Sequence, residues 1–404
     1  MSSQFLADRA KALKGSPTLA LVGIAKDLIS RGHDVISLTV GEPDWNTFPA
    51  VSEAGIEAIK KNYTKYTPAN GSIELRRQIV EQVSKDFGVS ADPSQILVGP
   101  GAKFVLYSAF YVVLNQGDEC LLFSPYWVSY PSMIELAGGV PRVVKTTAAT
   151  QFKLIATDLE KAITPKTKAF LFCSPSNPTG MVYSKKELED LAAVFRKHPQ
   201  VFILSDDIYN HLMFSTNQIA PHLLHVAPDL APRILSINGG SKTYSMTGWR
   251  IGWAFGSAEV IKALGDFQSQ ALGAPSSIAQ YALQKSLLSC EADIREVNSM
   301  LKSRMLMAIE AFRILPEFKV YEPQGAFYLW LDISAVLGRF FHGQQVNDSK
   351  TFCEILLHKF YVATVPGIES GSEGFMRLSF ANDPQRFKEA VSRIKNFVDQ
   401  LGQL

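Results

Sequence analysis

Lys242 follows a short apolar run, residues 233–237, and the sequence Asn238-Gly239-Gly240. This pattern predicts a lysine just past the end of a buried strand, with Arg250 eight positions further along. A lysine amine in a desolvated place can be neutral near physiological pH, which is the form that a Schiff base requires. The alternative is a solvated loop lysine, which is the commoner situation. The residues that follow the neighbouring strands distinguish a reactive lysine from a solvated one.

A glycine loop follows another apolar run, residues 95–98, and precedes a predicted helix. The loop reads Gly99-Pro100-Gly101-Ala102-Lys103, and the free backbone N–H groups at such a helix start can bind a phosphate. Lys103 in the first turn opposes the helix dipole, which favours an anion nearby. The alternative is an ordinary tight turn. Neither a Walker A loop nor GxGxxG is present, so the loop carries no nucleotide fingerprint.

Three further apolar runs are each followed by a polar or aromatic side chain. In an open parallel sheet the carboxyl ends of the strands share one crevice, where ligands bind. A tryptophan there can stack on a planar ligand or belong to the core, and an asparagine can serve a turn. An aspartate can cap a helix, but at the end of a buried strand it needs a cationic or protonated partner. The residues are Trp127 after 119–123, Asn177 after 169–173, and Asp206 and Tyr209 after 201–204.

Together these side chains match the parts of a pyridoxal 5′-phosphate site. Lys242 would bind the aldehyde, and Asp206 would keep the ring nitrogen protonated. Asn177 and Tyr209 would hydrogen-bond the ring oxygen, and Trp127 would stack on the ring. The phosphate would be held by Gly101, Ala102, Lys103 and Arg250.

The elements that must position these residues alternate between helices and short apolar strands from about residue 50 onward. Such runs are typical of a mostly parallel sheet that is buried on both faces, so we expect an α/β domain. Helices are predicted near 50–61, 72–87, 103–116, 127–137, 157–163 and 185–197. Strands are predicted near 95–98, 119–123, 142–144, 169–173, 201–204, 233–237 and 250–255.

The order of elements changes after a long helical region near 257–314. Bunched strands with flanking helices indicate a smaller α+β domain, and the N-terminal segment is expected to pack with it. We therefore expect a large domain over 46–300 and a small domain made of 1–45 and 301–404. The predicted elements are a helix over 20–31 and a strand over 35–40, then strands near 318–322, 326–332, 361–365 and 375–380, with helices near 349–360 and 384–402.

The overall composition is that of an ordinary globular protein of 404 residues, long enough for two domains. The net charge of +2 gives no electrostatic reason to expect nucleic acid. Four separated cysteines without a CxxC motif indicate reduced thiols, and the histidines suggest no metal set. With neither a signal core nor a long apolar run, a cytoplasmic protein without membrane contact is expected.

Six motifs carry a resemblance to a known family. On these motifs the chain resembles the class I/II aminotransferases of PLP fold type I, and within them the bacterial aspartate aminotransferases of subgroup I-beta, some of which also accept prephenate. The resemblance covers nearly the whole chain, from about Lys14 onward, and implies a large α/β domain with a smaller α+β domain. The motifs are GEPD at 41–44, KYT at 65–67, SPYW at 124–127, SPSNPTG at 174–180, SDDIY at 205–209 and SKTYSMTGWRIGW at 241–253.

The resemblance implies further site residues. Arg377 corresponds to the arginine that binds the substrate α-carboxylate, and Gly41 to a backbone contact of the same carboxylate. Trp127 and Asn177 would also face the substrate. Tyr66 corresponds to a tyrosine that reaches the phosphate from a partner subunit, which implies a homodimer with shared active sites. The distal carboxylate of an acidic substrate would meet Lys103 and the N-terminal segment that carries Lys14, Ser16 and Thr18.

The resemblance implies a PLP-dependent transaminase that moves an amino group between an amino acid and a 2-oxo acid. L-aspartate and 2-oxoglutarate are the expected pair, with glutamate or prephenate as further substrates. An aromatic or kynurenine-type aminotransferase on the same fold is the alternative. A PLP-binding regulator without turnover is a second one, disfavoured because only about 40 residues precede Gly41, too few for a DNA-binding domain.

Overall fold

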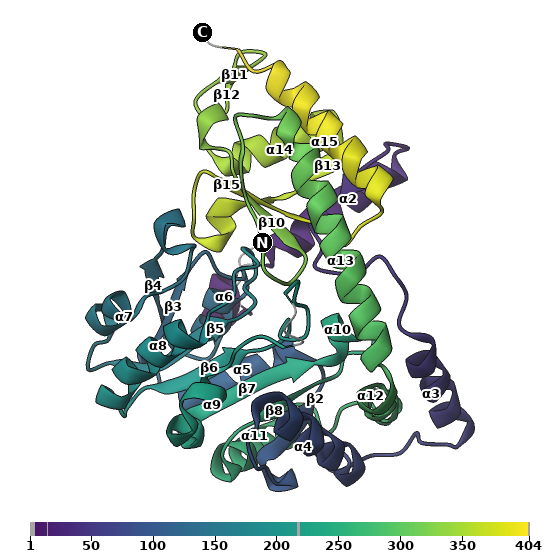
Figure 1. Ribbon diagram of the computed structural model, residues 1–404, viewed down its shortest axis with the longest axis vertical. Coiled ribbons are helices and arrows are strands. Elements are labelled where there is room, and N and C mark those ends of the chain that lie inside the picture. Colours follow the sequence, from purple (N-terminus) through teal and green to yellow (C-terminus); the bar gives the residue numbers. More distant parts are fainter. Residues whose placement is uncertain (1–4, 14, 216–218, 403–404) are drawn as a thin grey trace.

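A seven-stranded sheet forms the centre of the larger part of the chain (Figure 1). The computed structural model describes residues 5–13, 15–215 and 219–402. The strand order is β2-β8-β7-β6-β5-β3-β4, and β8 runs antiparallel to both neighbours while the other pairs are parallel. The mostly parallel sheet is therefore confirmed. The strands are β2 Ile96–Gly99, β3 Glu119–Ser124, β4 Val140–Lys145, β5 Thr167–Cys173, β6 Phe202–Asp206, β7 Ile234–Gly239 and β8 Gly252–Phe255.

Helices flank this sheet, and local capping explains several of their limits (Figure 1). Ser184 and Glu187 form a capping box at the start of α8, and Gly88 ends α4 in the left-handed conformation. The helix expected over 127–137 begins only at Tyr130, because the residues before it form a turn. The helices are α3 Pro49–Lys60, α4 Ile73–Phe87, α5 Ala102–Val113, α6 Tyr130–Leu136, α7 Ala156–Ala162, α8 Lys185–Lys197, α9 Leu223–Val226, α10 Gly240–Thr243, α11 Ala258–Ala271 and α12 Ser277–Ser289.

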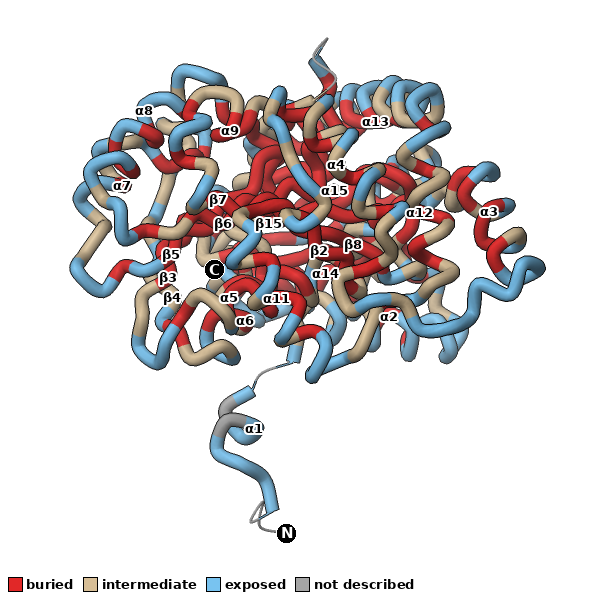
Figure 2. Tube along the Cα trace, turned by 90° about the horizontal axis from the view of Figure 1, so that it is seen from below, coloured by how far each residue is buried: buried red, intermediate tan, exposed pale blue. Residues whose placement is uncertain are grey.

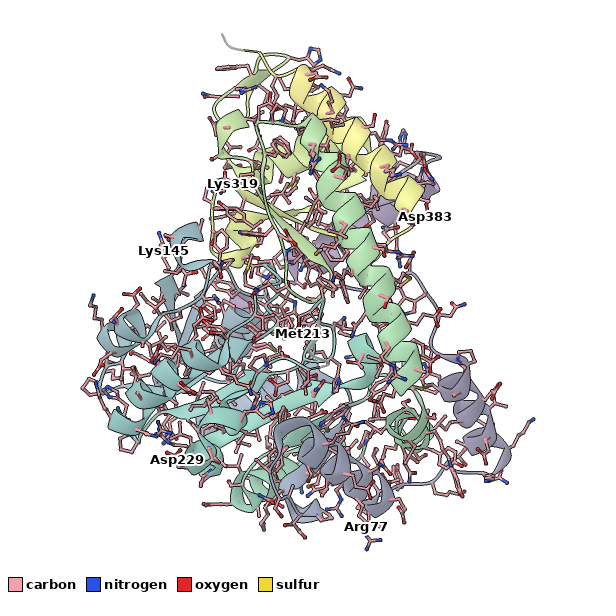
Figure 3. The ribbon with its side chains drawn as sticks, viewed as in Figure 1. Arg77, Lys145, Met213, Asp229, Lys319 and Asp383 are labelled. Carbon is pink, nitrogen blue, oxygen red and sulfur yellow. The ribbon has the colours of Figure 1, made fainter. Side chains whose placement is uncertain are left out.

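A second sheet belongs to the C-terminal part, with the antiparallel order β14-β15-β10-β9. A bridge between Met213 and Gly325 joins the loop after β6 to the turn before β10, near the middle of the molecule (Figure 3). The elements are α13 Glu291–Ala311, β9 Lys319–Tyr321, β10 Tyr328–Asp332, β11 Phe340–Phe341, β12 Gln344–Gln345, α14 Ser349–Phe360, β14 Val365–Pro366, β15 Phe375–Ser379 and α15 Pro384–Asp399.

The N-terminal segment contributes α1 Asp8–Ala12, α2 Pro17–Ser30 and the short strand β1 Ile36–Ser37. Strand β1 pairs in parallel with β13, Val362–Ala363. The strand expected over 35–40 stops at Ser37, because the next residue, Leu38, bonds to two strands of the C-terminal part: its N–H donates to Ala363 and its carbonyl accepts from Ser379.

These contacts place the N-terminal segment beside the C-terminal elements. Ala25 and Leu28 of α2 pack in one apolar cluster with Leu357 and Ala363. The expected limits at residues 45 and 300 stay a prediction, and α13 runs across the second of them.

The core lies along the central sheet, where the tube in Figure 2 is mostly buried, while α1 extends away from the body. One apolar cluster continues from the seven-stranded sheet into the C-terminal part, so the two parts share a core. Among the described residues, no helix combines the length and the apolar character that a membrane span requires.

Candidate active site

A cavity of about 500 Å³ lies at the carboxyl ends of the central strands. Its lining comes from three parts of the chain: the loops after the central strands, the N-terminal segment, and strands β10 and β15. Most residues singled out in the sequence line it. These are Thr18, Gly41, Ala102, Lys103, Trp127, Asn177, Asp206, Tyr209, Lys242, Arg250 and Arg377.

Lys242 lies in the single turn α10 that follows β7, as the strand pattern predicted. Its Nζ donates to the carbonyl of Gly41 at 2.5 Å. Burial lowers the pKa of Lys242 to about 8, and the positive charges of Arg250 and Arg377 act in the same direction, while Glu42 and Asp206 oppose the shift. A neutral amine is therefore accessible near physiological pH, which a nucleophilic lysine requires.

Asp206 is the last residue of β6 and is 5% exposed. Its Oδ2 accepts a hydrogen bond from the phenol of Tyr130 at 2.7 Å, and its Oδ1 accepts from the amide of Ile208 at 3.3 Å. Burial raises the pKa of Asp206 to about 6, although both hydrogen bonds oppose the shift. A carboxylate in this position stabilises a protonated base in the cavity.

Arg377 lies in β15 and is 3% exposed. Its Nη1 donates to Asn177 Oδ1 at 2.9 Å, and its Nη2 donates to the carbonyl of Thr39 at 2.5 Å. Among the described residues, its Nε has no hydrogen-bond partner and no carboxylate forms an ion pair with it. A buried guanidinium without an acidic partner is a site for an anionic ligand.

A second anion site lies at the start of α5. Gly101 precedes this helix with φ +94°, where a side chain is strained. A Cβ at Gly101 would lie 2.6 Å from Arg250 Nη2, and a Cβ at Gly252 would lie 2.5 Å from the amide nitrogen of Ala102. The two glycines thus let the Arg250 guanidinium and the first free amides of the helix approach each other, as phosphate binding requires.

Lys103 lies on another wall of the cavity. Its Nζ donates to Ser129 Oγ at 3.2 Å and lies 5.1 Å from the centre of the Trp127 ring. Burial lowers the pKa of Lys103, and the charge of Arg250 adds to the shift. Thr18 Oγ1 is buried and, within the described part of the chain, has no hydrogen-bond partner. Both polar groups therefore have capacity left for a ligand.

Comparisons with known proteins now decide the family. The family model described as "Aminotransferase class I and II" matches residues 33–394. The chain belongs to the class I and II aminotransferases. It is a PLP-dependent transaminase, as its resemblance implied, and the idea of a regulator without turnover loses its support.

Individual relatives cover nearly the full length of this aminotransferase. It is 40% identical to the aspartate aminotransferase of Bacillus sp. strain YM-2, over 98% of this chain and 99% of the relative. It is 41% identical to the aspartate/prephenate aminotransferase of Cereibacter sphaeroides, over 97% of this chain and 98% of the relative.

Solved structures agree with these relatives. The aspartate aminotransferase from Rhizobium meliloti has a TM-score of 0.94 at 35% identity, covering 98% of this chain and 99% of its own. The aspartate aminotransferase from Thermus thermophilus with maleate has a TM-score of 0.90 at 36% identity, covering 98% of this chain and 100% of its own. The expected fold type is thereby confirmed.

The groups that line the cavity of this aminotransferase fit the charges and the chemistry of pyridoxal 5′-phosphate. The anion site beside Arg250 suits the phosphate, Asp206 suits a protonated ring nitrogen, and the Lys242 amine suits the aldehyde. Within the described residues, no set of three or more His, Cys, Asp and Glu side chains could hold a metal ion.

Some predicted residues do not lie in the cavity. Tyr66 is 99% exposed, Gly101 is close to Arg250 but does not line the cavity, and Lys14 lies outside the described residues. Among the lining residues that were missed are two tyrosines, Tyr130 and Tyr328. Tyr130 follows Trp127 by three positions, which is a usable signal, whereas nothing in the local pattern marks Tyr328.

We expect the capture of PLP by the cofactor-free enzyme to become faster as the pH rises through about 8. Only the neutral Lys242 amine attacks an aldehyde, so with a pKa of about 8 the rate should fall roughly tenfold for each pH unit below that value. Stopped-flow absorbance after mixing with PLP measures the rate. A rate that still rises tenfold for each pH unit between about pH 9 and about pH 10 would contradict the lowered pKa of this amine.

Proposed function

We propose that this aminotransferase transfers the amino group between L-aspartate and 2-oxoglutarate. One observation carries the proposal: the cavity contains two cations, Arg377 and Lys103, that have no carboxylate partner among the described residues. Because Arg250 serves the phosphate site, these two cations remain for the two carboxylates of a dicarboxylic substrate. The names of the similar bacterial enzymes support the same substrate class.

The residues divide the work as follows. Arg377 would bind the α-carboxylate through two parallel hydrogen bonds, with the backbone of Gly41 beside it. Since Arg377 occupies Asn177 Oδ1, the amide nitrogen of Asn177 is left to donate to the ring oxygen, together with the phenol of Tyr209. Lys103 and Thr18 would bind the distal carboxylate.

PLP, when bound, accepts the electron pair that the substrate α-carbon releases. Asp206 keeps the proton on the ring nitrogen and so favours this flow of charge. The Lys242 amine would take the proton from the substrate α-carbon and hold it for return, a task that its pKa of about 8 suits. Trp127 would stack on the ring and hold it against these groups.

A donor panel with Lys103→Ala tests the substrate. We expect the wild-type enzyme to prefer aspartate over tyrosine and leucine in kcat/KM. Removing the distal cation should lower kcat/KM for aspartate by roughly 10–100-fold, since a charge-assisted hydrogen bond contributes about 1.5–3 kcal/mol. The value for tyrosine, which has no distal carboxylate, should change little.

The matched control is Lys145→Ala, an exposed lysine on the edge strand β4 outside the cavity (Figure 3). An unchanged aspartate preference in Lys103→Ala would refute the distal-carboxylate role. A wild-type preference for tyrosine or kynurenine would instead support the alternative substrate class. Prephenate, also a dicarboxylate, is tested as an acceptor in the same assay.

We also propose a homodimer in which Tyr66 reaches the phosphate of the partner's active site. The support is that Tyr66 is 99% exposed, that Ile56, Ile59 and Tyr63, shortly before it in the chain, are exposed as well, and that Arg250 is exposed at the rim of its own cavity. An apolar surface of this kind is typical of a face that another chain covers.

Mixed dimers test this arrangement. Lys242→Ala and Tyr66→Ala chains should each be strongly impaired alone, whereas refolding them together should restore about one quarter of wild-type activity. The recovery is expected because half the dimers are mixed and each contains one site with both wild-type residues. If Tyr66 served its own subunit, mixing would restore nothing.

We propose the cytoplasm as the location, supported by four buried cysteines that form no disulfide. Cell fractionation followed by an activity assay tests this location.

A further inference from the structure

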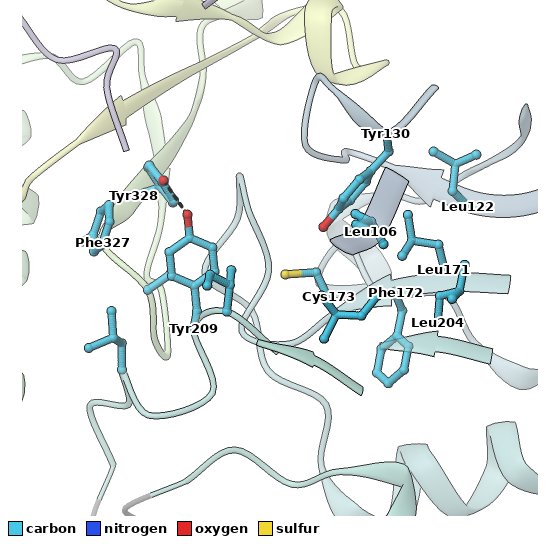
Figure 4. Close-up of a cluster of buried hydrophobic side chains, with 14 of the residues drawn as sticks. Leu106, Leu122, Tyr130, Leu171, Phe172, Cys173, Leu204, Tyr209, Phe327 and Tyr328 are labelled. Carbon is cyan, nitrogen blue, oxygen red and sulfur yellow. Dashed lines mark hydrogen bonds between the residues drawn. The ribbon is translucent and has the colours of Figure 1, made fainter. Parts of the chain in front are cut away.

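Tyr328 lies where the cofactor and substrate sites meet. It is the first residue of β10, lines the cavity and is 1% exposed. Its hydroxyl lies 2.7 Å from the hydroxyl of Tyr209, and Figure 4 shows the two phenols facing each other. Tyr209 follows β6 of the large sheet, so this hydrogen bond joins the two sheets.

The ring of Tyr328 also supports the arginine of the substrate site. The guanidinium carbon of Arg377 lies 4.6 Å from the centre of this ring. A cation over an aromatic face is stabilised by the ring quadrupole, most strongly where water is excluded. The neighbouring strands β10 and β15 fix the two residues relative to each other, since Tyr328 pairs with Ser379 and Trp330 with Arg377.

The Tyr328 hydroxyl also lies next to the backbone of Gly41, the residue whose carbonyl Lys242 contacts. A Cβ at position 41 would lie 2.1 Å from the Tyr328 hydroxyl oxygen, so only glycine fits there. The carbonyl of the same Gly41 accepts the hydrogen bond from Lys242 Nζ. One phenol is thus in contact with three groups assigned to the reaction: Tyr209, Arg377 and Gly41.

The direction of the phenol hydrogen bond follows from the number of protons available. Tyr209 has one hydroxyl proton, and it can donate either to Tyr328 or to a ligand, but not to both. Among the described residues, the Tyr328 hydroxyl has no hydrogen-bond partner other than Tyr209. When a ring oxygen is bound, Tyr209 donates to it, and Tyr328 donates to Tyr209.

We propose that Tyr328 is a positioning residue of this aminotransferase: its hydroxyl directs the Tyr209 proton toward the cofactor ring oxygen, and its ring holds Arg377 in the substrate site. The inference rests on the proposed role of Tyr209. Its consequence is that the α-carboxylate site and the cofactor ring oxygen are linked through one side chain. Cooperative hydrogen bonding makes Tyr209 a stronger donor while Tyr328 donates to it.

The variant Tyr328→Phe tests the hydroxyl and keeps the ring. Negative charge on the ring oxygen is greatest when the cofactor-linked Lys242 nitrogen has lost its proton, so a weaker Tyr209 donor raises the pKa of that nitrogen. We expect the pH midpoint of the absorbance change of the substrate-free holoenzyme to move upward by roughly half a pH unit to one pH unit.

A double-mutant cycle separates this role from a structural one. Tyr209→Phe should raise the midpoint more than Tyr328→Phe, and the double variant should match Tyr209→Phe alone, because the effect of Tyr328 passes through Tyr209. Tyr183→Phe is the matched control: this tyrosine is 2% exposed, and its hydroxyl accepts from the amide of Leu154, outside the cavity. Its midpoint should equal that of the wild type.

Three results are decisive. The proposal is overturned if the pH midpoint of the absorbance change in Tyr328→Phe equals that of the wild type. It is also overturned if the shift in the double variant equals the sum of the two single shifts. A wild-type chain that takes up no PLP would overturn the proposed function, which is a different observation from an unshifted midpoint in an enzyme that has bound PLP. Thermal unfolding of each variant, measured in parallel, keeps a loss of fold distinct from all three.

Discussion

Replacing Lys242 with alanine is expected to reduce transamination by about 10⁴-fold, the upper range for removal of an acid–base group. The variant loses both the amine that captures the cofactor and the base that moves the α-carbon proton. The other cofactor contacts, Asp206 and Arg250, remain, so PLP should still bind reversibly. Steady-state assays with aspartate measure the loss of activity.

A reduction experiment identifies the amine directly. Borohydride treatment of the wild-type holoenzyme should fix the cofactor to the peptide that contains Lys242, as mass spectrometry detects, and Lys242→Ala should remain unlabelled. Lys145→Ala, which removes an exposed lysine outside the cavity, is expected to be labelled and to turn over like the wild type. A wild-type label on Lys103 in place of Lys242 would show that the wrong cavity lysine has been assigned.

Replacing Arg377 with glutamine is expected to lower kcat/KM for aspartate by roughly 30-fold to several thousand-fold, because leaving one partner of a buried charge pair alone costs about 2–5 kcal/mol. Arg377→Lys should recover only part of this loss, since an ammonium group cannot form two parallel hydrogen bonds. The loss should appear in KM as well as in kcat, because Arg377 also fixes the Asn177 amide.

The PLP affinity of the Arg377 variants should stay close to that of the wild type, because Arg377 lies in the substrate site and away from the phosphate site. The control is Arg313→Gln, whose side chain is 74% exposed on the surface. Equal losses for aspartate and for a substrate analogue that lacks the α-carboxylate would contradict the assignment of Arg377 to that group.

The sequence pattern was enough to predict which main groups of the cavity lie together. Apolar runs with short helices between them imply a parallel sheet, and the carboxyl ends of its strands lie at one edge. Lys242, Asp206 and Asn177 were found by this rule alone, since each follows a buried strand. Arg377 needed the family resemblance, because a single arginine within a strand has no local signal.

Only the tertiary structure decided which side chains complete and orient these groups. Tyr130 meets Asp206 across 76 positions, and Tyr328 meets Tyr209 across 119, so neither contact leaves a mark in the local periodicity. The orientation of the Asn177 amide depends on Arg377 in the other sheet. The sequence by itself determined the chemistry at the strand ends, because periodicity is a property of neighbouring residues. The hydrogen bonds and the pKa values near 6 and 8 arise from burial and long-range contacts, which exist only when the chain is folded.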